Sequence, residues 1–213
     1  GDRRHRIGVI DIPTFYVDFD ARARGDENFR STTSDVRRLI TELEGDQIDA
    51  LIIDLRGNGG GALSEATALT GLFIESGPVV QVRDARGRTR INRDPENDLA
   101  YAGPLAVVVD RDSASASEIF AGAIQDYRRG IILGEDTFGK GTVQNLIDLD
   151  RYAQDSSVPL GQLKVTIAQF FRVSGASTQH RGVAPDIQIP SAQVINDYGE
   201  RSLKNALPWD EID

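Results

Sequence analysis

The sequence has 213 residues, enough for one sizeable hydrophobic core, and its 27% charged and 39% hydrophobic residues are typical of globular proteins. A formal net charge of −9 argues against nonspecific nucleic-acid binding, which needs clustered basic residues to neutralise phosphates. The absence of cysteine excludes disulfides and thiolate chemistry, and two histidines, His5 and His180, are a poor supply for a zinc site or a histidine base. We therefore expect no metal and no cofactor.

Buried strands and amphipathic helices alternate along the first half of the chain. Strands are predicted at 6–12, 48–55 and 104–110, and apolar spacing predicts a helix at 34–44 with Thr33 or Ser34 as its cap. A glycine-rich loop at 56–61 leads into a second helix that runs through Leu72. Residues 79–84 and 87–91 are predicted to form a hairpin around Gly87.

The second half continues the alternation. The later part of 111–127 predicts a helix, and 130–134, 142–149 and 164–173 predict strands. Strand–helix–strand order is typical of an α/β fold with a largely parallel central sheet. The last 24 residues, 190–213, are expected to form a peripheral tail. No apolar run approaches the roughly 20 residues of a membrane helix. No signal peptide is visible, and the abrupt ends lead us to expect a piece of a longer protein.

The segment "GEDTFGKGTVQ" (134–144) raises the question of what Lys140 does. A phosphate-binding loop is a poor match, because Gly141 replaces the Ser or Thr that binds magnesium and two acidic residues would repel phosphate. A solvated lysine in a turn is the simplest interpretation. A general base is the third, because burial can lower the pKa of a lysine until it accepts a proton near neutral pH.

A base needs a nucleophile, and "VVVDRDSASASEIF" (107–120) offers three serines at a strand–turn–helix junction. Ser115 and Glu118 match the capping box S-x-x-E, so Ser115 is either a helix cap or an exposed nucleophile with backbone amides beside it. Ser113 and Ser117 remain competing candidates. The loop "LRGNGGGA" (55–62) has glycines at 57, 59, 60 and 61, which allow N–H groups to turn toward one point or simply form a tight turn.

Together, "DLRGNGGGALSEA", "VDRDSASASEIFAGAIQDY" and "GEDTFGKGTVQ" resemble the tail-specific protease, or C-terminal processing peptidase, family of serine peptidases. "STQHRGVAPDI" (177–187) and "ALPWD" (206–210) are similar to its periplasmic Gram-negative members. The resemblance implies a ClpP/crotonase-like β-α spiral core at 1–190 and a peripheral segment at 191–213. It also implies a periplasmic location, for which association with the membrane is a further expectation.

The resemblance assigns roles residue by residue. It implies Ser115 as nucleophile, Lys140 as base, Gln144 as the residue that orients the base, and the amides of Gly61 and Ala116 as the oxyanion hole. An acidic position of the family matches Asp126, which is expected to lie on the same helix face as Ser115 and to play a supporting role.

The implied activity is ATP-independent acyl transfer on proteins with apolar C-termini, with the substrate added as an extended chain beside a strand. The family's PDZ domain, which captures that C-terminus, is not found in these residues. A catalytically idle binding or scaffold module is therefore the alternative. A crotonase-type thioester enzyme and a nucleotide-binding protein are less favoured. An adaptor protein that delivers the substrate is a further candidate partner.

Overall fold

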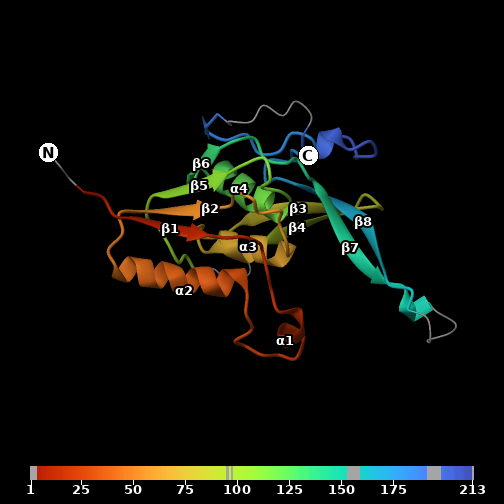
Figure 1. Cartoon of the computed structure of the whole chain (residues 1–213), viewed down its shortest axis with the longest axis horizontal. Coiled ribbons are helices and arrows are strands. Elements are labelled where there is room, and N and C mark those ends of the chain that lie inside the picture. Colours follow the sequence, from red (N-terminus) through yellow and green to blue (C-terminus); the bar gives the residue numbers. More distant parts are fainter. Residues whose placement is uncertain (1–3, 95, 97, 153–158, 191–197, 213) are drawn as a thin grey trace.

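The chain forms two β-sheets and four α-helices in the residues described by this computed structural model (Figure 1). The structure describes residues 4–94, 96, 98–152, 159–190 and 198–212. The central sheet has the strand order β1-β2-β5-β6-β9, and each of its pairings is parallel. Its strands are β1 (Ile7–Asp11), β2 (Ala50–Asp54), β5 (Leu105–Val109), β6 (Ile131–Gly134) and β9 (Ile187–Gln188). The predicted α/β fold with a parallel central sheet is confirmed.

The second sheet is antiparallel, with the order β4-β3-β8-β7. Its strands are β3 (Pro78–Asp84), β4 (Thr89–Arg93), β7 (Thr142–Asp148) and β8 (Gln162–Phe171). The predicted hairpin around Gly87 is present, and Gly87 takes the positive φ of 78° that such a turn favours. The β7–β8 hairpin projects from the body of the molecule, and β7 is an edge strand (Figure 1).

The helices are α1 (Phe19–Ala23), α2 (Thr32–Gly45), α3 (Leu63–Gly71) and α4 (Ala116–Asp126), with short 3₁₀ turns at Asp150–Tyr152 and Glu200–Ser202. The predicted cap of α2 was wrong: Ser31 caps it. The Ser31 hydroxyl accepts from the Ser34 N–H at 3.2 Å, and the Ser34 hydroxyl accepts in return from the Ser31 N–H. Serine at the third helical position thus completes the capping box, where the usual pattern has Glu or Gln.

An aromatic cluster anchors α4 in the core. Phe120 lies in the middle of α4 and is fully buried, with its ring 5.8 Å from that of Phe73 and 6.5 Å from that of Phe15. Burial of one such ring stabilises the fold by about 1.5–3 kcal/mol. The helix is therefore held firmly, and so is the turn that precedes its first residue.

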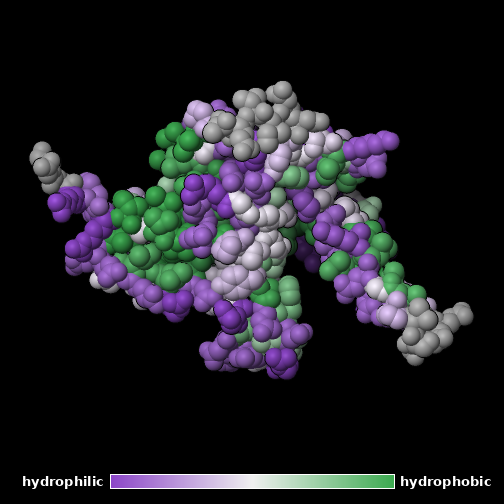
Figure 2. Space-filling view, viewed as in Figure 1, coloured by the Kyte–Doolittle hydropathy of each residue, from purple (hydrophilic) through white to green (hydrophobic). Residues whose placement is uncertain are grey.

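One face of the central sheet is open on its β1 side. Along β1, Gly8 and Ile10 face the interior, where a Cβ added at Gly8 would lie 3.0 Å from Leu43 of α2. The alternate residues Ile7 and Val9 are 47% and 58% exposed. Figure 2 shows the resulting apolar patch over this part of the sheet. The sheet thus differs from most parallel sheets, whose two faces are both covered.

The described part of the C-terminal segment packs on the surface of the core. The Trp209 indole N–H donates to the Ser177 carbonyl at 2.9 Å, and the Arg181 guanidinium lies 3.6 Å from the centre of the indole ring. Residues 191–197 and 213 of the predicted peripheral segment, and residues 1–3 of the predicted core, lie outside the described residues. The domain boundary at 190 stays a prediction. Among the described residues, no helix is long and apolar enough to cross a membrane.

Candidate active site

Ser115 lies at a sharp turn between β5 and α4. Its φ of 58° and ψ of −111° are unusual for a residue with a side chain, and such a conformation costs about 1–3 kcal/mol. A strained strand-to-helix turn of this kind exposes a serine hydroxyl above the sheet in other hydrolases. The Ser115 N–H donates to the Glu118 carboxylate at 2.8 Å, which is the Glu118 half of the predicted capping box.

The two competing serines have structural roles. The Ser113 hydroxyl donates to the Leu55 carbonyl at 2.8 Å, and the Ser117 hydroxyl donates to the Asn58 carbonyl at 2.9 Å. Both side chains are fully buried. Of the three serines, Ser115 alone lines the cavity described below, and the assignment of Ser115 as nucleophile stays a prediction.

Five of the six predicted site residues line one cavity of about 880 Å³: Ser115, Lys140, Gln144, Gly61 and Ala116. The cavity lies between residues 15–19, the glycine loop, the start of α4 and strand β7. Its walls are largely apolar, with contributions from Phe15, Leu63, Ile119, Val143 and Phe170. It therefore suits an apolar ligand beside the Ser115 hydroxyl.

Lys140 is half-buried, and its ammonium donates to the Thr142 carbonyl at 3.0 Å. Burial lowers the pKa of Lys140; the nearby charge of Lys164 acts in the same direction, and the carboxylates of Glu200 and Glu118 oppose it. No hydrogen bond joins the Lys140 and Ser115 side chains in the described structure. They line the same cavity, but the Lys140 ammonium is hydrogen-bonded to the first residue of β7, the strand that follows it.

Glu118 joins the serine turn to the lysine loop. Its fully buried carboxylate accepts from the Thr137 hydroxyl at 2.6 Å, the Gly139 N–H at 2.7 Å and the Lys140 N–H at 2.9 Å, in addition to Ser115. Burial raises the pKa of Glu118 to about 7, although all four hydrogen bonds lower it. The capping pattern gave Glu118 a local role only, so sequence reasoning missed the three contacts with residues 137–140.

The backbone N–H groups of two cavity-lining residues, Gly61 and Ala116, are candidates for the predicted oxyanion hole. Gly61 has a φ of 146°, and an added Cβ would lie 2.1 Å from the Phe15 carbonyl, so only glycine fits. The neighbouring Gly60 carbonyl and Ala62 N–H bond to Phe15, which leaves the Gly61 N–H unused. The Ala116 N–H opens α4 and, like that of Gly61, has no hydrogen-bond acceptor among the described residues.

Asn58 fixes the glycine loop and was not singled out in the sequence. Its fully buried side chain donates to the Ile12 carbonyl at 2.7 Å and accepts from the Gly60 N–H at 2.8 Å. An added Cβ at Gly60 would lie 2.8 Å from the Ser115 Cβ, so the loop packs directly on the serine turn. The signal available in the sequence was an asparagine that stands between glycines in the loop.

The remaining two predicted residues lie at the margin of the site. Gln144 is exposed on β7 at a register shift, and its amide reaches the Thr166 hydroxyl at 3.5 Å. Asp126 lies at the other end of α4 from Ser115, about 16 Å along the helix axis. Its carboxylate binds the Arg172 guanidinium at 2.6 and 3.2 Å, and it does not line the cavity.

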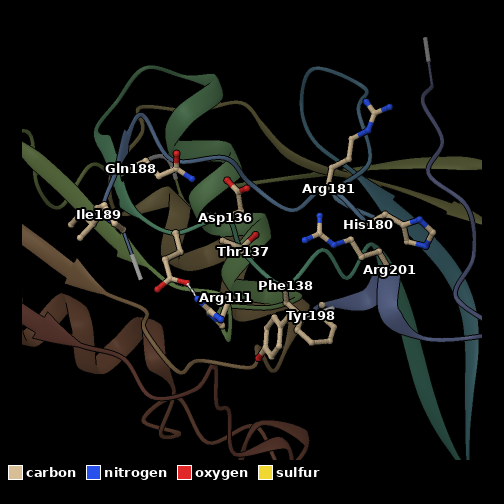
Figure 3. Close-up of a pocket in the computed structure, with 13 residues that line it drawn as sticks. Arg111, Asp136, Thr137, Phe138, His180, Arg181, Gln188, Ile189, Tyr198 and Arg201 are labelled. Carbon is tan, nitrogen blue, oxygen red and sulfur yellow. Dashed lines mark hydrogen bonds and ion pairs between the residues drawn. The ribbon is translucent and has the colours of Figure 1, made fainter. Parts of the chain in front are cut away.

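A second pocket of about 470 Å³ also has Phe138 in its lining, and Figure 3 shows the residues around it. It is lined by Arg111, Arg181 and Arg201 among others, and by the rings of Phe138 and Tyr198, whose centres are 5.8 Å apart. Phe138 is the one residue shared with the larger cavity among the described lining residues. The second pocket contains neither the serine nor the lysine.

Comparisons with known proteins place the chain in a family. The model of peptidase family S41 matches residues 6–189. The tail-specific protease of Haemophilus influenzae is 52% identical over 206 residues, which are 97% of this chain and 28% of that protein. The chloroplastic C-terminal processing peptidase of Tetradesmus obliquus is 36% identical over 189 residues, 89% of this chain and 36% of that protein. The chain thus spans about a third of the length of these two relatives.

The fold agrees with the sequence comparison. The solved photosystem II D1 C-terminal processing protease superposes with a TM-score of 0.69 and 31% identity, covering 86% of this chain and 42% of that one. Mature CPAF, at 17% identity and a TM-score of 0.66, shares the fold. The resemblance carried by the three sequence motifs is confirmed, and the chain belongs to peptidase family S41.

Proposed function

We propose that this chain is the proteolytic core of an ATP-independent serine endopeptidase that cleaves proteins through an acyl-enzyme. One observation carries the proposal: Ser115, at a strained turn, shares a cavity with a lysine of lowered pKa and with two unused backbone N–H groups. These are a nucleophile, a base and donors for an oxyanion. The S41 membership supports the same reading.

In the first step, neutral Lys140 exchanges its bond to the Thr142 carbonyl for one to the Ser115 hydroxyl. As the serine oxygen attacks the peptide carbonyl carbon, its proton passes to the lysine amine. The N–H groups of Gly61 and Ala116 stabilise the negative charge that develops on the carbonyl oxygen. One such donor contributes about 3–4 kcal/mol to transition-state stabilisation in other serine peptidases.

In the second step, the protonated lysine gives its proton to the leaving amine as the peptide bond breaks. The C-terminal fragment departs, and an ester joins the N-terminal fragment to Ser115. Water then attacks the ester, with Lys140 accepting one water proton and returning it to the serine oxygen. The lowered pKa of Lys140 matters in both steps, because a lysine that stays protonated cannot act as a base.

Other residues position this pair. Glu118 holds the N–H groups of Ser115 and Lys140 on one carboxylate oxygen, so it sets the separation of the two loops. Gln144, on the cavity wall, orients the lysine amine by its amide oxygen. Asp126 acts from a distance, because its pair with Arg172 fastens the end of β8 to α4.

The substrate enters as an extended chain along the free edge of β7, with apolar side chains against the cavity wall. We propose that apolar C-termini mark the protein substrates, that a PDZ domain of the longer protein captures them, and that an adaptor can deliver them. The location we propose is the periplasm of a Gram-negative bacterium, supported by the Haemophilus relative.

The test compares the parent chain with Ser115→Ala and Lys140→Ala on an unfolded protein that has an apolar C-terminus. Both variants should lose cleavage while keeping the parent's unfolding transition. Ser76→Ala and Lys204→Ala are matched controls, because these two residues do not line the cavity and are not part of the turn that contains Ser115. Activity that survives both site substitutions would refute the assignment.

Fluorophosphonate labelling separates this function from the alternative of an idle binding module. The reagent should modify Ser115, and the label should be absent from Ser115→Ala. An activated serine reacts with the reagent, whereas a serine that only caps a helix does not. A parent chain that binds the substrate but is neither labelled nor active would support the binding module.

A further inference from the structure

The lysine loop, residues 138–141, is bonded to two other parts of the chain. From the serine turn, the Glu118 carboxylate accepts from the N–H groups of Gly139 and Lys140. A second set of hydrogen bonds comes from residues 177–179. None of the predicted site residues belongs to that segment, so its contribution to the site is visible only in the folded chain.

The second set binds the backbone at Lys140 and at the residue after it. The side-chain oxygen of Gln179 accepts from the Gly141 N–H at 2.8 Å. The Thr178 hydroxyl donates to the Lys140 carbonyl at 3.3 Å, and the side chains of Gln179 and Thr178 are fully buried. The approach is close, because a Cβ added at Gly141 would lie 2.6 Å from the Ser177 Oγ. A buried N–H that loses its acceptor costs about 1–3 kcal/mol, so the Gln179 bond holds Gly141 in place.

The Gln179 amide also binds the C-terminal segment. Its Nε2 donates to the Leu207 carbonyl at 2.9 Å and to the Glu200 carboxylate at 3.4 Å. Only this orientation of the amide satisfies both ends, because Gly141 offers a donor and Leu207 an acceptor. The Glu200 N–H donates in turn to the Phe138 carbonyl at 3.0 Å. Gln179 therefore connects the lysine loop to residues 199–207 through one buried network.

Glu200 brings a charge to this network. Its side chain is buried, and it lines a small pocket together with Thr142, whose carbonyl binds the Lys140 ammonium. Burial lowers the pKa of Lys140, and the Glu200 carboxylate is the charge that opposes this most strongly. Lys164 of β8 acts with burial, and Glu118 of α4 acts against it. The segment that Gln179 binds thus carries a charge that acts on the base.

We propose that Gln179 is a positioning residue of the peptidase, which fixes the lysine loop where Lys140 can reach Ser115 and fastens that loop to residues 199–207. The inference rests on the proposed function. Gln179 does not line the cavity, so its removal should leave substrate contacts in place. A misplacement of about 1 Å can lower a rate about a hundredfold, so the effect should fall on kcat. Residues 199–207 then serve the placement of the base rather than forming a peripheral tail alone.

The experiment compares Gln179→Met with the parent in kcat, KM and fluorophosphonate labelling of Ser115. Methionine keeps the length of the side chain but neither accepts from Gly141 nor donates to Leu207. The kcat and the labelling rate should fall about tenfold or more, while KM stays within about twofold of the parent's. Gln179→Glu keeps an oxygen that accepts from Gly141 and should retain more of the parent's kcat. Thr70→Val removes a buried hydroxyl bond within α3 as a control and should keep the parent's kcat.

A second readout needs no catalysis. Lys140 is one of three lysines, so a chain with ¹³C-labelled lysine gives one side-chain NMR signal for each, and Lys164→Gln and Lys204→Gln assign the other two. In Gln179→Met the pKa of Lys140 should rise toward that of an ordinary lysine, because a released loop is less buried. Glu200→Gln keeps an acceptor for the Gln179 amide but removes the opposing charge, so it should lower the pKa of Lys140 further. The α3 control should leave this pKa unchanged.

The two readouts separate this inference from the proposed function. A Gln179→Met chain with the parent's kcat and the parent's Lys140 pKa would overturn the role of Gln179 while leaving the endopeptidase intact. A loss of kcat with an unchanged Lys140 pKa would also overturn it, because loss of stability alone would then explain the effect. If Gln179→Met does not fold, an unchanged Lys140 pKa in both Gln179→Glu and Glu200→Gln would overturn the inference. The expected pKa changes in a parent that neither cleaves nor is labelled would overturn the proposed function alone.

Discussion

Glu118→Gln tests whether the buried carboxyl carries the raised pKa that its surroundings impose. The change keeps the shape of the side chain but removes its proton equilibrium. In the folded chain burial raises the pKa of Glu118 from 4.5 to about 7. A raised pKa means that the folded state holds the proton more tightly than the unfolded state. The resulting stability is fully present below about pH 4.5 and is lost as pH rises through about 7.

The size of the effect follows from the shift. Each pKa unit is worth about 1.4 kcal/mol, so a shift from 4.5 to about 7 corresponds to roughly 3 kcal/mol. Near pH 4.5 the protonated carboxyl of Glu118 and the glutamine amide are both neutral, so the parent and the variant have the same charge at this buried position. Near pH 8 the parent also bears the cost of a buried charge. The free energy of unfolding of the parent, relative to Glu118→Gln, should therefore fall by about 3 kcal/mol between these pH values.

Urea unfolding at a series of pH values measures this difference directly. Subtracting the variant's curve from the parent's removes the titration of all shared groups. Glu75→Gln is the matched control, because Glu75 is exposed and its curve should run parallel to the parent's. Parallel curves for the parent and Glu118→Gln would show that Glu118 has an ordinary pKa, and that its four hydrogen-bond donors offset the effect of burial.

Three further predictions concern the surroundings of the site. Gly60→Ala, with its new Cβ 2.8 Å from the Ser115 Cβ, should lower kcat/KM at least tenfold, whereas Gly45→Ala, with open space around it, should not; equal activities would refute the contact. Asp126→Asn should cost about 2 kcal/mol in urea unfolding because the partly buried Arg172 loses its pair, and a loss below about 0.5 kcal/mol would contradict this. Lys140→Arg should be inactive, since a guanidinium stays protonated, and the parent's kcat/KM should rise with pH through the lowered pKa of Lys140; an active arginine variant would rule out the base.

The fold was largely predictable because its signals are local. The hydrophobic periods of the strands and long helices repeat within a few residues, and the central strands appear within two residues of their predicted ends. The misses are short or set by context: α1 has five residues, β9 has two, and the cap at Ser31 depends on a serine at the third helical position. The short helix and the short strand contain too few residues for a periodic pattern, and the cap depends on a single side chain rather than on a pattern.

The sequence by itself determined where the chemistry-bearing segments lie: a glycine loop after β2, a serine turn before α4 and a lysine before β7. Each segment follows a predicted strand and has a recognisable residue pattern of its own. Only the tertiary structure decided which serine is accessible, because the carbonyls of Leu55 and Asn58 that bind Ser113 and Ser117 come from a segment about sixty positions away.

The alignment of the lysine loop was likewise decided in three dimensions. Glu118 signalled a helix cap three residues from Ser115, which is a local pattern. Its bonds to residues 137, 139 and 140 form only when parallel strands β5 and β6 bring the turn after each strand to the same edge of the sheet. The number of residues between Glu118 and Lys140 does not predict that these two turns lie side by side, because their proximity depends on how α4, the helix between them, packs on the sheet.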